Sequence, residues 1–178
     1  MAIDEASGRV LGEPAAVPIP RQRIGHLSVS ADGASIAMAS FATEGDMEAL
    51  TFDAARGTVG ARRRVTNSSD TSARPSVSPD GRWIAFHRVQ QDGQEDLWVV
   101  NRDGTGLRRL TDDAPRDRRP LWSADGTRLL FYSDRTGRYQ VWTIAADGSA
   151  LMQVTDHPGM LIQPVSSTAG TRALASVT

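Results

Sequence analysis

Residues 74–86 read Arg-Pro-Ser-Val-Ser-Pro-Asp-Gly-Arg-Trp-Ile-Ala-Phe, and residues 119–131 read Arg-Pro-Leu-Trp-Ser-Ala-Asp-Gly-Thr-Arg-Leu-Leu-Phe. A weaker copy of this stretch begins at His26, and a degraded copy begins at Gln163. The turn glycine of the copies recurs at intervals of 48, 45 and 44 residues, at Gly33, Gly81, Gly126 and Gly170. A recurring period of this length predicts a repeat architecture.

A second motif recurs in step with the first. It is an apolar run followed by a glycine turn, and its glycines are spaced 49, 47 and 44 residues apart, at Gly8, Gly57, Gly104 and Gly148. Each repeat therefore holds four short strands, joined in pairs by Asp-Gly turns. Because Asp-Gly between apolar runs is typical of two-residue hairpins, we expect both turn residues to have positive φ.

Four antiparallel strands in about 45 residues are typical of one blade of a β-propeller, so we expect an all-β fold. A single blade cannot bury both faces of its sheet, and the stacking of neighbouring blades makes the core. The aromatic residues of the strands are therefore interpreted as packing between blades. They are Trp83, Phe86, Trp98, Trp122, Phe131 and Trp142.

The repeats divide the chain, residues 1–178, into three whole blades and two half blades of a single propeller domain or propeller segment. The whole blades are residues 26–66, 74–111 and 119–155, and the half blades are residues 1–18 and 163–178. We expect this to be part of a larger propeller. Two alternatives stay open: a closed four-blade ring with a composite blade, and self-association of two chains into an eight-blade ring.

Composition excludes several classes of protein. The 20 basic residues, all arginine, oppose 21 acidic ones, which argues against binding to nucleic acid driven by bulk charge. The absence of lysine and cysteine removes Schiff-base, thiol and cysteine–zinc chemistry. No apolar run is long enough for membrane insertion, and residues 1–14 do not resemble a signal peptide. The compartment, periplasm or cytoplasm, stays unknown.

Three stretches resemble the TolB-like, WD-repeat-like β-propeller repeats of bacteria: residues 78–86, 96–104 and 133–142. The resemblance covers nearly the whole chain and implies the propeller fold. It implies function less specifically, because one fold hosts many activities. The family includes a periplasmic protein that binds other proteins of the cell envelope. Similar propellers gate prolyl-oligopeptidase-type serine hydrolases, and others are sensor modules of kinases or transcription regulators.

The chain carries no recognisable catalytic motif, so we expect that it is not an enzyme and holds no cofactor. The Gly-x-Ser-x-Gly elbow of serine hydrolases is absent, and no histidine lies in a metal-ligand pattern. The carboxylates of Asp112, Asp113, Asp117 and Asp134 lack a calcium-loop spacing. We interpret them as solvated loop residues rather than as a metal site.

One register of the repeat is a candidate binding site. Seven residues before each turn glycine stands a polar residue that opens the innermost strand: His26, Arg74, Arg119 and Gln163. These side chains are expected to border the mouth of the central channel and to accept an acidic or carbonyl-rich segment. The alternative is that they pair within the chain with Asp70, Asp112, Asp113 or Asp117.

The face with the longer loops is where we expect a protein or peptide partner, because long polar loops on a rigid scaffold commonly bind ligands. The residues predicted on this face are Asp70, Asp117, Arg118, Asp134 and Arg135. The first hypothesis is thus a non-catalytic interaction or sensor propeller. The alternative is the gating propeller of a prolyl-oligopeptidase-like serine hydrolase whose catalytic domain is not in this chain.

Overall fold

The computed structural model describes residues 2–3, 10–11, 23–30, 35–41, 45–166 and 173–177. These residues form strands and turns. The strands are β1 (Ala2–Ile3), β2 (Val10–Leu11), β3 (Arg23–Val29), β4 (Ser35–Phe41), β5 (Met47–Asp53), β6 (Thr58–Arg64), β7 (Thr71–Val77), β8 (Trp83–Val89), β9 (Glu95–Asn101), β10 (Arg108–Arg109), β11 (Asp117–Trp122), β12 (Arg128–Ser133), β13 (Gln140–Ala145), β14 (Met152–Gln153), β15 (Leu161–Ser166) and β16 (Ala173–Val177). No helix in this part of the chain is long and apolar enough to cross a membrane.

The strands form antiparallel sheets whose order follows the chain. Three sheets have four strands each, β3 to β6, β7 to β10 and β11 to β14, and two have two strands, β1–β2 and β15–β16. The prediction of a β-propeller built from four-stranded antiparallel blades is confirmed. We call the three four-stranded sheets blades 1, 2 and 3.

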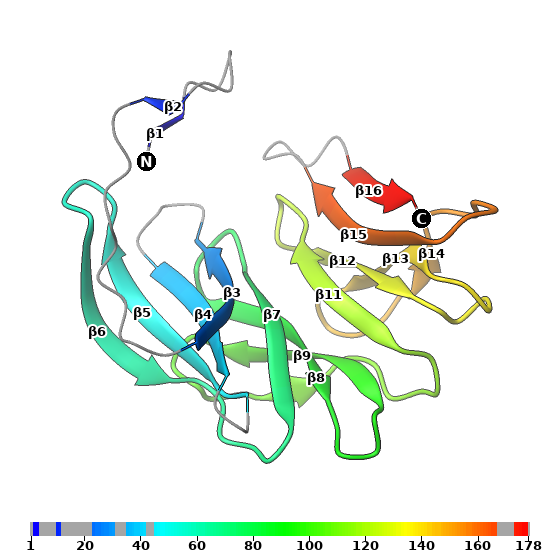
Figure 1. Ribbon diagram of the computed structural model, residues 1–178, viewed down its shortest axis with the longest axis horizontal. Coiled ribbons are helices and arrows are strands. Elements are labelled where there is room, and N and C mark those ends of the chain that lie inside the picture. Colours follow the sequence, from blue (N-terminus) through cyan, green and yellow to red (C-terminus); the bar gives the residue numbers. More distant parts are fainter. Residues whose placement is uncertain are drawn as a thin grey trace.

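The first strand of each blade is the innermost one. Strand β7 contacts β3 on one side and β11 on the other, and β11 also contacts β15, so these four strands lie side by side at the centre of the fan (Figure 1). Serine hydroxyls join them across the blades. Ser28 Oγ accepts a hydrogen bond from Val77 N at 2.9 Å, and Ser76 Oγ accepts one from Trp122 N at 3.3 Å.

The core lies between blades. One cluster joins blades 1 and 2 around Phe86, and a second joins blades 2 and 3 around Phe131. Both rings are 0% exposed. Trp98 packs at the edge of the first cluster and Trp142 at the edge of the second. The aromatic residues therefore hold neighbouring blades together, as the sequence predicts, because no blade can bury its faces alone.

The Asp-Gly turns differ from the expected two-residue hairpins. Gly81 and Gly126 have a φ of +68°, but the aspartates that precede them, Asp80 and Asp125, do not have a positive φ. Gly81 N donates to Ser78 O, so Pro79 and Asp80 are the central residues of the turn, and Ser78 N donates to Trp83 O, so the hairpin loop has four residues instead of two. The Asp80 carboxylate accepts hydrogen bonds from Ser78 Oγ and Arg82 N, so it stabilises a turn followed by a left-handed glycine.

A threonine follows the fourth strand of each whole blade and contacts the start of the third. Thr66, Thr111 and Thr155 accept a hydrogen bond from a backbone amide near the start of the third strand, at Met47, Leu97 and Val141 respectively. The hydroxyl of each threonine is also directed at a side-chain oxygen of the residue that precedes this amide in the chain, which is Asp46, Asp96 or Gln140. This contact gives a structural role to a threonine that recurs at positions 66, 111 and 155.

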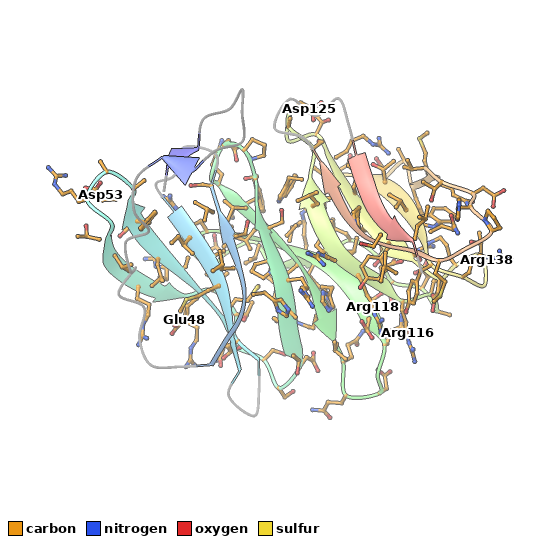
Figure 2. The ribbon with its side chains drawn as sticks, turned by 45° about the horizontal axis from the view of Figure 1, so that its top comes forward. Glu48, Asp53, Arg116, Arg118, Asp125 and Arg138 are labelled. Atoms are coloured by element: carbon orange, nitrogen blue, oxygen red, sulfur yellow. The ribbon has the colours of Figure 1, made fainter. Side chains whose placement is uncertain are left out.

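The two ends of each blade carry different loops. In blade 3, Asp125 of the β11–β12 turn lies at one end, and Arg116 and Arg118 lie at the opposite end (Figure 2). In blade 1, Asp53 and Glu48 are separated in the same way (Figure 2). The short glycine turns thus share one face of the fan, which we call the turn face. The loops between blades and the β8–β9 and β12–β13 loops share the other, the long-loop face.

Candidate functional site

A cavity of about 360 Å³ lies among the innermost strands. Its walls come from β3, β7, β11 and β15, and they are His26, Leu27, Ser28, Arg74, Pro75, Ser76, Arg119, Pro120, Leu121 and Pro164. The structure therefore brings together three of the four residues that the repeat register singled out. Gln163, the fourth, lies in β15 beside Pro164, and its side chain lies outside the described residues. We call this space the channel-mouth cavity.

Each inner strand carries a β-bulge at the cavity. In β7 the register shifts by one residue between Ala73 and Ser76, and in β11 it shifts between Arg118 and Leu121. The extra residue lets Arg74 and Arg119 adopt φ of +54° and +55°, in the left-handed region that L-residues avoid. Two arginines in this conformation at the same register are costly for folding, and such strain is commonly found at functional sites.

Neither of these arginines has an acidic partner in the part of the chain that the structure describes. The carboxylates that could have neutralised them bind other cations. Asp113 and Asp117 bind Arg135, and Asp112 binds Arg109. Asp70 lies close enough to Arg88 to affect its pKa. The expected alternative, pairing with these aspartates, is thus not found for Arg74 and Arg119 among the described residues.

The arginines of the cavity lie close enough together to lower the pKa values of neighbouring basic groups. Burial, together with the charges of Arg74 and Arg119, lowers the pKa of His26 to about 4, so this imidazole is neutral at pH 7. Burial and the charge of Arg119 also lower the pKa of Arg74, while Tyr132 acts in the opposite direction. A neutral imidazole can still donate one hydrogen bond and accept another. The cavity therefore presents two guanidinium charges and one uncharged imidazole.

His87 is a neighbour of this site that the sequence did not single out. It lies in β8, and its backbone is paired with that of Ala73, next to Arg74. The side chain is 8% exposed, and burial plus the charges of Arg118 and Arg74 lower its pKa to about 3. Only the strand register brings it here, so the spacing of the repeat gave no signal for it.

The long-loop face holds an ionic network rather than a set of free charges. Arg135 lies 2.7 Å from Asp117 and 2.6 Å from Asp113, and Asp117 is 0% exposed. The interpretation of Asp117 as a solvated loop residue is therefore wrong: the adjoining hairpin buries it under Arg135. The pKa of Arg118 is raised by its hydrogen bonds to Glu95, which join β11 to β9.

The remaining residues predicted on this face also have partners within the chain. Asp134 Oδ1 accepts a hydrogen bond from Arg116 N at 2.8 Å, and Asp70 N donates one to Ser68 Oγ at 3.1 Å. Arg118 also stacks on Tyr139, with its guanidinium carbon 5.3 Å from the ring centroid. Adjacent residues of β11 thus differ: Arg118 is neutralised at a blade interface, whereas Arg119 faces the cavity and pairs with no carboxylate of the described residues.

Comparison with known proteins finds relatives that are similar to this chain over a short part of their own length. The chain is 38% identical over 74 residues to the uncharacterized protein Atu1656 of Agrobacterium fabrum, covering 42% of this chain and 25% of that protein. It is 34% identical over 67 residues to dipeptidyl-peptidase 5 of Porphyromonas gingivalis, covering 35% of this chain and 10% of the peptidase. The matched segments thus span a quarter or less of these relatives.

Similarity to solved structures extends over most of the chain. The crystal structure of TolB from Acinetobacter baumannii superposes with a TM-score of 0.75 at 21% identity, covering 92% of this chain and 40% of that one. At this identity the likeness concerns the fold. The sequence profile of the TolB beta propeller domain, PD40, matches residues 21–177, which is most of the chain. The chain therefore belongs to the TolB β-propeller domain family.

Proposed function

We propose that this propeller is a binding module without chemistry of its own, which takes a segment of a protein or peptide at the channel-mouth cavity. The observation that carries the proposal is the pair Arg74 and Arg119. Both line one cavity, both have a strained backbone, and neither has a carboxylate partner among the described residues. An unneutralised pair of guanidinium groups in a concave site favours a ligand that supplies the missing anion.

The experiment compares peptide binding by two double variants. Randomised heptapeptides are selected on the immobilised protein, synthesised with a fluorescent label and measured by fluorescence polarisation. Replacing both Arg74 and Arg119 with alanine is expected to weaken binding at least about tenfold, since each lost charge-assisted hydrogen bond costs about 1.5–3 kcal/mol. The melting transition should stay nearly unchanged.

A second double variant controls for net charge. Arg82 and Arg138 are exposed and lie outside the cavity, so replacing both with alanine removes the same charge without touching the site. This control should bind the selected peptides as the wild type does. Unchanged binding by the Arg74→Ala/Arg119→Ala variant would show that the cavity is not the binding site.

A second candidate function is the gating propeller of a prolyl-oligopeptidase-like serine hydrolase. The similarity to dipeptidyl-peptidase 5 over 67 residues supports it. This candidate predicts a Gly-x-Ser-x-Gly segment in the same reading frame. It is tested by sequencing the DNA that flanks the codons for Met1 and Thr178, and by assaying the whole encoded protein on dipeptidyl nitroanilides. A frame without any hydrolase segment would rule this candidate out.

A further inference from the structure

We propose that the channel-mouth cavity binds the C-terminal carboxylate of a peptide chain whose last side chain is apolar. The inference rests on the proposed function and adds the chemical group that the site recognises. Three features of the cavity support it: the charge of its two arginines, its apolar walls, and the absence of backbone N–H groups on its prolines.

The charge of the cavity calls for a small anion. Its described lining contains Arg74 and Arg119 and no acidic residue. The carboxylates of Glu95 on β9 and Asp117 on β11 are already bound by Arg118 and Arg135. Guanidinium groups bind carboxylates through two parallel hydrogen bonds, and two of them can hold one carboxylate from both sides.

The apolar walls argue against a polyanion. Pro75, Pro120 and Pro164 are buried around the cavity, and Leu27, which is 55% exposed, stands at its edge. Nucleic acids and other polyanions bind to extended basic surfaces, but this chain has a net charge of −1. A site with two cations and an apolar collar fits one carboxylate attached to an apolar side chain.

The prolines also argue against an internal segment of a peptide. Proline has no N–H, so the wall formed by Pro75, Pro120 and Pro164 offers no backbone donors to a chain that runs past them. The volume of about 360 Å³ lies at the lower end of the range for ligand sites. This volume and the concentration of donors on two arginines favour a terminal residue over a threaded chain.

The test uses the selected heptapeptides in matched chemical forms. Each peptide is synthesised with a free C-terminal carboxylate and with a C-terminal amide, and further peptides carry leucine or serine as the last residue. An amidated peptide with an internal glutamate serves as the third arm. We expect the free acid ending in leucine to bind at least about tenfold more tightly than its amide and than the serine form.

Substitutions then assign the effect to the arginines. Arg74→Ala and Arg119→Ala should each abolish the preference for the free acid, whereas the Arg82→Ala/Arg138→Ala variant should keep it. Arg74→Lys should recover part of the affinity, because it restores the charge without the planar fork. A circular dichroism spectrum and a melting curve of each variant verify that the fold is intact.

The outcomes separate this inference from the proposed function. One outcome would overturn the inference and leave the proposed function standing. In it, peptides bind, the Arg74→Ala/Arg119→Ala variant has a lower affinity for them, and the amidated peptide or the one with the internal glutamate binds as tightly as the free acid. If inorganic phosphate displaces the free acid as effectively as N-acetylleucine does, the site is a general anion site and the inference is also overturned. If no peptide binds, both proposals fail.

Discussion

The arginine side chains of this propeller differ in whether a carboxylate of the same chain neutralises their charge. Arg118 and Arg119 are neighbours in β11, yet Glu95 neutralises the first, and the second lines the channel-mouth cavity. The two side chains diverge at the β-bulge, where Arg119 has a φ of +55°, so Arg118 reaches Glu95 of the adjoining blade and Arg119 does not. Arg119, rather than the ion-paired Arg118, is therefore the residue that indicates a binding site.

Two histidines are predicted to stay neutral in mildly acidic solution. Burial and nearby arginines lower the pKa of His26 to about 4 and that of His87 to about 3, against 6.5 in an unfolded chain. The folded protein therefore binds fewer protons than the unfolded one below pH 6.5, so these groups stabilise it above that pH. This stability is lost as the pH falls from 6.5 through 4 to 3.

Proton NMR of the imidazole resonances checks this prediction. Spectra of the His26→Gln and His87→Gln variants assign the signals, and a titration from pH 8 to pH 4 follows their chemical shifts. His87 should hardly move over this range, and His26 should move only near its acid end. A midpoint near 6.5 for either residue would contradict the burial and the arginine contacts described above.

At the scale of the strand, the β-bulges place arginines at the cavity in a backbone conformation that lowers the stability of the fold. In β7 the bulge gives Arg74 a φ of +54°, a conformation that costs an L-residue roughly 1–2 kcal/mol. Glycine adopts it freely, so Arg74→Gly should be more stable than Arg74→Ala by about 1 kcal/mol once the greater freedom of glycine in the unfolded chain is counted. Both variants lack the guanidinium group.

Urea unfolding of the two variants measures this difference, and Arg119 in β11 allows the same comparison, because its φ is +55°. Equal stabilities of the glycine and alanine variants would mean that the bulge is not strained. If the difference is found, retaining arginine at this position reduces stability and provides a cation at the cavity, which is the trade-off expected of a binding site.

The strand-level features differ in how far the sequence predicts them. The blade period, the inner strand and the shared register of His26, Arg74 and Arg119 follow from residues that repeat along the chain. The bulges do not, because an extra residue is recognised only against the partner strand. The burial of Asp117 also could not be predicted, since it depends on Arg135 from the next loop folding back over it.

The threonine that follows the fourth strand of blade 2 gives another strand-level prediction. Thr111 Oγ accepts the hydrogen bond of Leu97 N at 3.0 Å, and Leu97 is 0% exposed. Thr111→Val keeps the shape of the side chain but leaves this buried amide without an acceptor, which should cost about 1–3 kcal/mol of unfolding free energy. Thr136→Val is the control, because Thr136 is exposed in the β12–β13 loop, and its replacement should cost less than about 0.5 kcal/mol.

The whole molecule is a row of blades in which each blade is stabilised by its neighbours. The most deeply buried strands, β7, β8 and β9, belong to blade 2 and contribute to the two core clusters. The outer strands β6 and β14 are mostly exposed. In such a repeat array the stability is a sum of blade and interface contributions, so it should be greatest in the middle and decline outward.

Hydrogen exchange followed by mass spectrometry should therefore show graded protection, strongest for β7, β8 and β9 and weakest for β6 and β14. Leu129→Ala opens the interface between blades 2 and 3, where Leu129 is 0% exposed, and should cost about 2–5 kcal/mol. It should lower protection in both of these blades more than in blade 1. Leu107→Ala, at a leucine that is 44% exposed, is the matched control and should change the pattern little. Uniform exchange across all strands, or equal effects of the two variants, would mean that the blades unfold as one unit rather than as coupled neighbours.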